Sequence, residues 1–129
     1  MFLKKDTFNY GEASVEMYEL SGLQRVEYLE YIQQRTAQYE RETEKSTEEE
    51  SRVAFLRMGI DINAWLVSCS LRNGAQAQDA VKTSDNIASL WSYEALGKGA
   101  DMVLSLSGMT PPDSDSEEEG VEADSPEKP

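Results

Sequence analysis

Hydrophobic and polar positions alternate near the start of the chain and recur with a helical period afterwards. Ala13, Val15 and Met17 alternate with Ser, Glu and Tyr, which is the period of a β-strand. Residues 9–11, Asn-Tyr-Gly, include types that tolerate the positive φ of a tight turn. We therefore expect a β-hairpin over residues 2–19. A lone hairpin is marginally stable in water, so it should pack on the helices that follow.

The next pattern predicts a long helix over about residues 22–44. Ser21 and Gln24, three residues apart, fit a capping box at its start. Its apolar and aromatic positions form a broad face, made of Leu23, Val26, Tyr28, Leu29, Tyr31 and Ile32. After Ala37 the sequence becomes strongly charged, so we expect the end of this helix to be a solvated arm.

A second helix is predicted over residues 48–72, where Thr47 and Glu50 form another capping box. One of its faces carries Val53, Leu56, Ile60, Ala64, Val67 and Leu71. Another face carries Phe55, Ile62, Leu66 and Cys69. A helix that is apolar on two sides is usually central in its fold. Residues 72–74, Arg-Asn-Gly, predict that it ends with Asn or Gly in a left-handed cap.

Two shorter helices are predicted after it, over residues 78–91 and 93–107. The first of these helices is predicted because Ala80, Ser84, Ile87 and Trp91 would share one face of it. Ser92 can cap the second, whose apolar positions are Tyr93, Leu96, Ala100, Val103 and Leu104. Gly108 suits the position after the last helix, with Met109 folding back as an apolar contact. Gly-Lys-Gly-Ala-Asp (97–101) lacks the spacing of a phosphate loop and indicates instead a local weakness of the helix or a close packing point.

The predicted fold is mainly α, a small helical domain of about four helices preceded by an N-terminal β-hairpin. Residues 1–109 form the folded domain, and residues 110–129 form a disordered acidic tail or linker. From residue 110 onward, eight acids and one lysine give a charge of −7, and the preceding residues carry −6. Val121 is the one large apolar side chain of the tail, which cannot bury enough surface to become ordered.

The net charge of −13 and the lack of a basic stripe argue against direct binding to nucleic acid. The most apolar stretch, residues 64–71, is too short for a membrane span, which needs about 20 apolar residues. The start of the chain has no apolar segment typical of a signal peptide. One cysteine, Cys69, cannot form an internal disulfide. We therefore expect a soluble cytoplasmic protein.

No catalytic, cofactor-binding or metal-binding residue is predicted, and the chain is not expected to be an enzyme. It contains no histidine, and Cys69 lies in an apolar run typical of an inert buried thiol. The acidic stretch 113–120 has glutamate where a calcium loop needs glycine. Trp65 and Trp91 are interpreted first as core residues. They are also candidate partner-binding residues, together with Tyr28, Tyr31 and Leu66.

Several segments resemble the lambda-type phage minor tail protein G family. They are Met-Phe-Leu-Lys (1–4), Glu-Leu-Ser (19–21) followed by Leu-Gln-Arg (23–25), Trp91 with Glu-Ala (94–95), and Leu-Ser-Gly-Met (106–109). The resemblance covers nearly the whole body in the same order. The N-terminal block and Leu-Ser-Gly-Met are its specific parts. The middle matches in pattern only.

The resemblance implies a tail assembly chaperone acting in the host cytoplasm late in infection and absent from the finished virion. It implies a tape measure protein as client, kept soluble while the tail tube polymerises around it. It also implies a −1 ribosomal frameshift that yields a longer form, through which the major tail protein is recruited. Self-association is a further expected contact. The alternative, suggested by charge alone, is an acidic DNA mimic that inhibits a host nucleic-acid-binding protein.

Overall fold

The computed structural model describes residues 2–74 and 84–109. Within these ranges two strands are followed by four helices, which confirms the predicted mainly α fold with an N-terminal hairpin. The elements are β1 (Lys5–Tyr10), β2 (Ala13–Tyr18), α1 (Gly22–Thr43), α2 (Glu48–Arg72), α3 (Ser84–Leu90) and α4 (Tyr93–Leu106). Predictions that concern residues 75–83, including the first part of the helix expected over 78–91, lie outside the described residues. So does the prediction of a disordered tail over 110–129.

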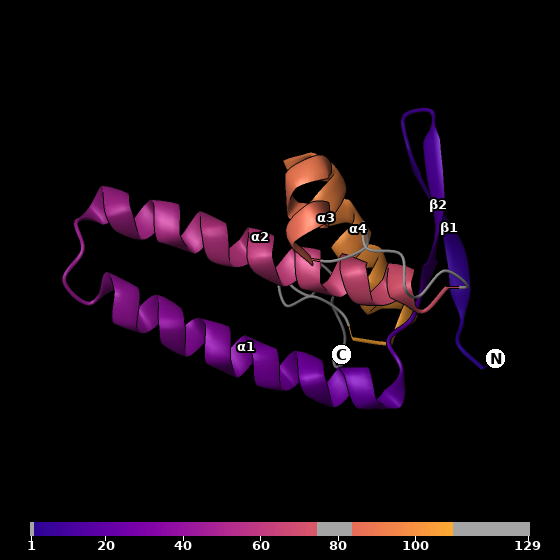
Figure 1. Cartoon of the computed structure of the whole chain (residues 1–129), viewed down its shortest axis with the longest axis horizontal. Coiled ribbons are helices and arrows are strands. Elements are labelled where there is room, and N and C mark those ends of the chain that lie inside the picture. Colours follow the sequence, from indigo (N-terminus) through magenta and orange to yellow (C-terminus); the bar gives the residue numbers. More distant parts are fainter. Residues whose placement is uncertain (1, 75–83, 110–129) are drawn as a thin grey trace, which may run out of the picture.

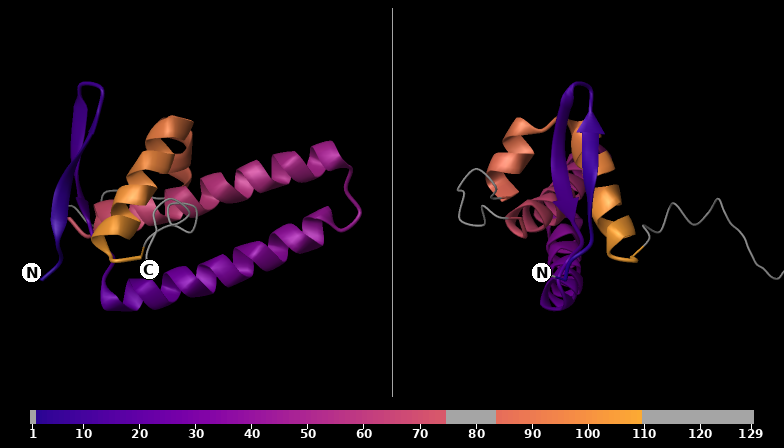
Figure 2. Two further views of the ribbon diagram at one scale, coloured as in Figure 1. Left: turned by 180° about the vertical axis from the view of Figure 1, so that it is seen from behind. Right: turned by 90° about the vertical axis from the view of Figure 1, so that its right-hand side faces the viewer.

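The two long helices α1 and α2 run antiparallel and form the length of the molecule (Figure 1). Helices α3 and α4 pack on the C-terminal half of α2, and the hairpin stands at that same end (Figure 2). The opposite end of the helix pair, where α1 leads into α2, projects beyond the other elements (Figures 1 and 2). Residues 36–57, which include this end and the part of α2 that borders α3, are called the arm below. Helix α2 contacts α1, α3, α4 and β2, so its predicted central position is confirmed.

Both predicted capping boxes are present. At the start of α1, the Gln24 N–H donates to Ser21 Oγ at 3.2 Å and the Ser21 N–H donates to Gln24 Oε1 at 2.9 Å. Thr47 and Glu50 make the same pair of bonds at 3.1 and 3.0 Å at the start of α2. Ser92 caps α4 as expected. Each pair satisfies amide groups that the first turn of a helix leaves without a partner.

The hairpin turn is shorter than predicted. The register pairs Tyr10 with Ala13, so Gly11 and Glu12 form the turn and Asn9 remains in β1. Gly11 has φ 61°, a conformation that glycine adopts without steric cost. Only part of the hairpin reaches the core, because Met17 is buried while Val15 remains exposed.

The last helix ends as predicted. Gly108 has φ 74°, its N–H donates to Ser105 O at 3.1 Å, and the Met109 N–H donates to Leu104 O at 2.7 Å. These two bonds define a Schellman motif, which satisfies carbonyl groups at the helix end. Met109 packs against the core, so the expected apolar contact is also present.

The left-handed cap predicted for α2 is wrong. Asn73 has φ −73°, and Gly74 is not among the glycines with positive φ. The Asn73 side chain instead donates across the fold to Glu19 O at 3.1 Å and to Gln24 Oε1 at 2.8 Å. Gly74 lies close to the hairpin, since a Cβ there would be 3.2 Å from the Tyr18 ring. Tertiary contacts therefore determine how this helix ends.

The core lies where α2, α4 and the end of the hairpin meet. Its buried apolar members are Phe8, Met17, Leu20, Ala64, Leu66, Val67, Cys69, Leu71, Ile87, Leu96, Ala100, Val103 and Leu104. Gly99 is a close packing point, as one interpretation of residues 97–101 expected. A Cβ at Gly99 would lie 3.1 Å from the Trp91 ring and 3.3 Å from Val67. The broad apolar face predicted for α1 is only partly covered, because Leu23, Val26 and Leu29 are exposed.

Candidate partner-binding surface

Three of the five candidate residues form an aromatic contact between α1 and α2. The Trp65 ring lies 5.5 Å from the Tyr31 ring, nearly parallel to it, and 5.9 Å from the Tyr28 ring. Burial raises the pKa of both tyrosines. Trp65 also packs against the core, in line with its first interpretation. These side chains therefore join the two helices, with their partly exposed edges at the surface.

An ion pair between a buried arginine and a partly exposed aspartate lies one turn further along the same helix pair. Arg35 is buried, and its Nε and Nη2 each lie 3.0 Å from Asp61 Oδ2. Its Nη1 is buried without a hydrogen-bond partner among the described residues. Breaking such a pair leaves an uncompensated charge, so the pair opposes separation of α1 from α2.

Trp91 packs at the other end of the molecule. Its ring stacks on Phe8 at 5.8 Å. Beside it, a mainly apolar pocket of about 320 Å³ lies between the hairpin and the α3–α4 connection. Leu66, the fifth candidate, is only 1% exposed and belongs to the core. It can therefore influence a partner only through its neighbours. A partner-binding role for all five residues remains a prediction.

Sequence reasoning missed a set of apolar side chains on the arm. Val53, Phe55 and Leu56 of α2 are exposed, although Val53 and Leu56 share a helix face with the buried Ala64 and Val67. The periodic pattern was visible in the sequence, but it does not show which part of a face is covered.

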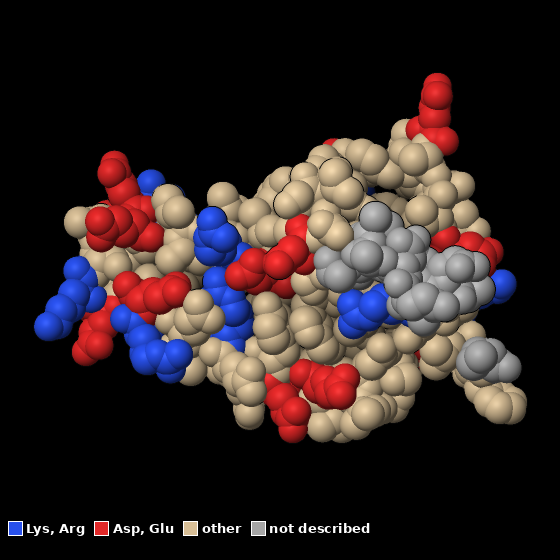
Figure 3. All heavy atoms as spheres, in the orientation of Figure 1, with Lys and Arg blue, Asp and Glu red and all other residues tan. Residues whose placement is uncertain are grey.

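Two adjoining pockets run along this uncovered part of α2. One, of about 480 Å³, lies between α2 and α3 and is lined by Val53, Leu56, Arg57, Ile60, Asp61, Asp85, Ala88 and Ser89. The other, of about 560 Å³, lies between α2 and the end of α1 and is lined by Glu42, Glu49, Glu50, Val53, Ala54 and Arg57. They share Val53 and Arg57, and together they are called the arm groove. In Figure 3 charged side chains of both signs surround the arm.

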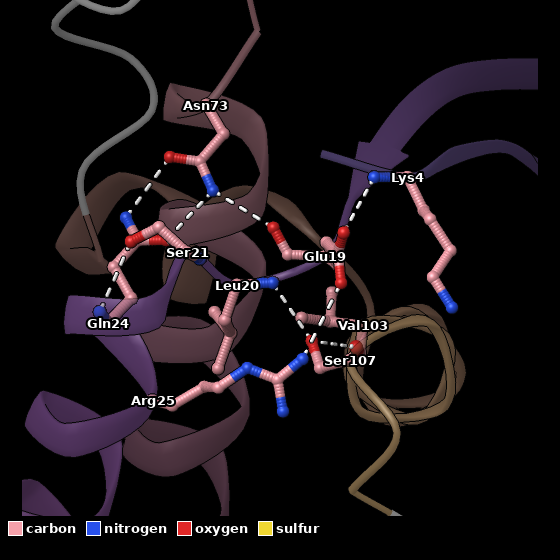
Figure 4. Close-up of polar contacts among 9 residues, drawn as sticks. All are labelled: Lys4, Glu19, Leu20, Ser21, Gln24, Arg25, Asn73, Val103 and Ser107. Atoms are coloured by element: carbon pink, nitrogen blue, oxygen red, sulfur yellow. Dashed lines mark hydrogen bonds and ion pairs between the residues drawn. The ribbon is translucent and has the colours of Figure 1, made fainter. Parts of the chain in front are cut away.

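A polar junction at the opposite end connects four elements (Figure 4). Glu19 Oε2 accepts from the Lys4 N–H at 2.8 Å, and Glu19 Oε1 lies 3.5 Å from Arg25. The Leu20 N–H donates to Ser107 Oγ at 2.9 Å. The Glu-Leu-Ser segment (19–21) and the Leu-Ser-Gly-Met segment (106–109) therefore touch. Lys4 and Arg25 belong to two more of the segments that carry the family resemblance, so four of those segments meet in one place.

Cys69 is buried in the core, where it is poorly suited to act as a nucleophile. Burial raises the pKa of its thiol to about 11, and the nearby Arg72 only partly opposes that shift. A buried protonated thiol is unreactive. Residues 2–74 and 84–109 contain no group of three or more side chains suited to hold a metal ion. No helix in those ranges has the length and apolar character needed to cross a membrane.

Comparison with known proteins identifies the family. Residues 1–125 match the family described as "Bacteriophage lambda tail assembly chaperone, TAC, protein G". The chain belongs to this family. It is a family of tail assembly chaperones rather than a class of enzymes, and the bacteriophage tail assembly role follows from membership. No solved structure matches the chain.

Curated relatives agree with this assignment. The chain is 31% identical over 121 residues to tail assembly protein G of Escherichia phage N15, covering 87% of this chain and 80% of the relative. It is 32% identical over 117 residues to tail assembly protein G of Escherichia phage lambda, covering 84% of this chain and 79% of the relative. It also matches tail assembly protein GT of both phages but spans only 45% and 39% of those proteins. The family thus includes a shorter and a longer protein that share the region present here.

Proposed function

We propose that this protein binds a tape measure protein, the long helical protein that sets tail length. It keeps that client soluble in the host cytoplasm while the tail tube polymerises around it, and it is absent from the mature virion. The observation that carries the proposal is membership of the tail assembly chaperone family. The exposed apolar side chains of the arm support it, because a chaperone for a helical client needs apolar groups at its surface.

The charge of the chain suits this role. A net charge of −13 keeps many copies soluble and makes them repel one another. Each copy needs only modest affinity, because many binding sites along one long client multiply the overall strength of binding.

We also propose that a −1 frameshift near the end of the gene gives a longer form that recruits the major tail protein. The existence of G and GT relatives supports this. Residues 127–128, Glu-Lys, are compatible with an A-rich slippery sequence. The nucleotide sequence tests the proposal directly. An open −1 frame downstream is expected, and a stop codon immediately after the slip would refute it.

Co-expression tests the client assignment. The full chain is produced with the tape measure protein of the same phage, and the soluble fraction is analysed by gel filtration. We expect the client to become soluble and to elute in a complex with this chain. The control replaces the chain with an unrelated acidic protein of similar size and charge. If the client stays insoluble with both proteins, the assignment is wrong.

The acidic DNA-mimic alternative rests on charge alone and is separated by a truncation. About half of the net charge lies in residues 110–129. Removing them should leave binding to the tape measure protein intact, because the proposed binding surface lies in the folded body. Loss of binding on removal of the tail would favour a function carried by the acidic segment.

A further inference from the structure

We infer that the arm groove binds a positively charged amphipathic helix. The inference rests on the proposed chaperone function, because it assigns that helix to the client. It also specifies which face of the protein the client contacts and which chemistry it presents there.

The first argument is continuity with the core. Along one face of α2, Ala64, Val67 and Leu71 are buried by the elements around the C-terminal half of the helix. The same face continues through Ile60, which is partly buried, to Leu56 and Val53, which are 48% and 65% exposed. Helix α3 borders only part of this stretch. A docked helix would extend the layer that α3 begins.

The second argument is shape. The floor of the groove runs along α2 from Glu49 to Asp61, which corresponds to about 18 Å at 1.5 Å per residue. α3 forms one wall and the end of α1 forms another. A partner helix of about 12 residues, or three turns, matches that length. Apolar side chains at helical spacing on the partner would meet Val53, Leu56 and Ile60, as in other helix-in-groove complexes.

Charge decides which helix fits. The described lining residues include five carboxylates, Glu42, Glu49, Glu50, Asp61 and Asp85, and one basic residue, Arg57. Asp61 is already paired with Arg35, so the other four exceed the basic charge of the groove. A second copy of this chain, or its own tail with a charge of −7, would bring further negative charge next to the carboxylates of the groove and be repelled. Lysine or arginine beside the apolar face of a partner helix would be attracted instead.

The groove is held ready for binding. The Arg35–Asp61 pair fixes the middle of α1 to α2, and Tyr39 packs on Phe55 at 5.9 Å within the arm. Thr47 and Glu50 cap the start of α2 inside the arm. A surface already ordered before binding loses little conformational entropy when the partner arrives.

The outer face of α1 supplies a matched control. Leu29 is 56% exposed, close to the 48% of Leu56, and both residues lie in the interior of a long helix. Leu29 does not line the arm groove. Leu56→Asp and Leu29→Asp therefore add the same charge at similarly exposed positions, and neither should unfold the protein.

The first experiment titrates the full chain with a labelled peptide. The peptide is about 14 residues long, with leucines at helical spacing on one face and lysines on the other. Wild type and Leu29→Asp should bind it alike, while Leu56→Asp should weaken binding about tenfold or more. That loss would occur although the substitution adds negative charge. A peptide with glutamate in place of lysine should bind at least about tenfold more weakly to the wild type.

Several results of the titration would overturn the inference. Equal effects of the two substitutions, or equal binding of the two peptides, would do so. Tighter peptide binding after removal of residues 110–129 would show that the tail occupies the groove. A wild-type dimer that Leu56→Asp dissociates in sedimentation measurements would show that a second copy does.

The second experiment repeats the co-expression with the tape measure protein, using the same variants. If wild type and Leu29→Asp keep the client soluble and Leu56→Asp does not, the groove is the client site. If all three keep it soluble, the groove inference is wrong while the chaperone function stands. If the wild type fails, the proposed function itself is wrong. If only Leu29→Asp fails, the client binds the outer face of α1 instead.

Discussion

Replacing Ser107 by alanine tests the physical account of the junction most directly. Ser107 is 1% exposed, and its Oγ accepts the Leu20 N–H at 2.9 Å while donating to Val103 O at 2.7 Å. The two losses are not equal. Val103 O also accepts the Ser107 backbone N–H at 3.0 Å, so it keeps a partner after substitution. The buried Leu20 N–H does not.

The expected cost follows from that asymmetry. A buried donor left without a partner costs about 1–3 kcal/mol, whereas an exchanged hydrogen bond contributes about 1 kcal/mol. We therefore expect Ser107→Ala to lower the free energy of unfolding by about 1–3 kcal/mol. Urea titration followed by far-UV circular dichroism measures it. The midpoint should fall while the slope with denaturant remains unchanged, because the surface exposed on unfolding is nearly the same.

Ser105→Ala is the control, since Ser105 lies in the same helix with its side chain exposed. Its effect should stay within about 0.5 kcal/mol of wild type, as is usual for surface substitutions. If Ser107→Ala proves as stable as Ser105→Ala, the Leu20–Ser107 bond contributes nothing measurable. The junction would then not anchor the hairpin exit to α4.

Further predictions concern α4 and the core. Gly97→Ala should raise the free energy of unfolding by up to about 1 kcal/mol, because a Cβ there meets nothing within 4 Å and glycine is a poor helix former. Gly99→Ala should lower the free energy of unfolding, because the new Cβ would crowd Trp91 and Val67. Thermal melts of both variants test this, and a gain of stability in both would contradict the packing account. The Cys69 thiol should react with a thiol reagent only as fast as the protein unfolds. Burial raises the pKa of this thiol from 9.0 to about 11, so the buried neutral thiol contributes fully to the free energy of unfolding below pH 9. That contribution is lost as pH rises through 11, and denaturant titrations across this range measure the loss.

Local chemistry was predictable from the sequence, and long-range coverage was not. Ser21 and Thr47 could be identified as caps because each bonds within its own first turn. The roles of Ser70 and Ser107 could not be predicted. They accept hydrogen bonds from the backbone N–H groups of Tyr18 and Leu20, which lie 52 and 87 residues away in the sequence. Nothing in the sequence around a serine shows that a distant amide needs it.

The same distinction applies to the candidate surface. Residue type alone makes the five aromatic and apolar residues candidates for partner binding. The structure shows that Leu66 is interior and that the rings of Trp65 and Trp91 mainly join elements of the fold. The arm groove depends on where α3 lies relative to α2. Helical periodicity fixes which residues of α2 share a face but not how far along that face its neighbours extend.

Two segments from the specific parts of the family resemblance lie apart from the surface proposed to carry function. The Glu-Leu-Ser and Leu-Ser-Gly-Met segments meet at the junction, while the arm groove lies toward the other end of the long helices (Figure 1). Leaving Val53 and Leu56 exposed forgoes stabilisation, since full burial of such side chains contributes about 1.5–3 kcal/mol each. The junction, the core and the direct contacts between α1 and α2 must therefore hold the helix pair without burial of these two side chains. Carboxylates around the exposed side chains oppose pairing of two identical arms, yet they would attract a basic partner. In the proposed complex, apolar exposure would supply the affinity and acidic charge would restrict binding to a basic partner. Removing either should then impair the chaperone by a different route.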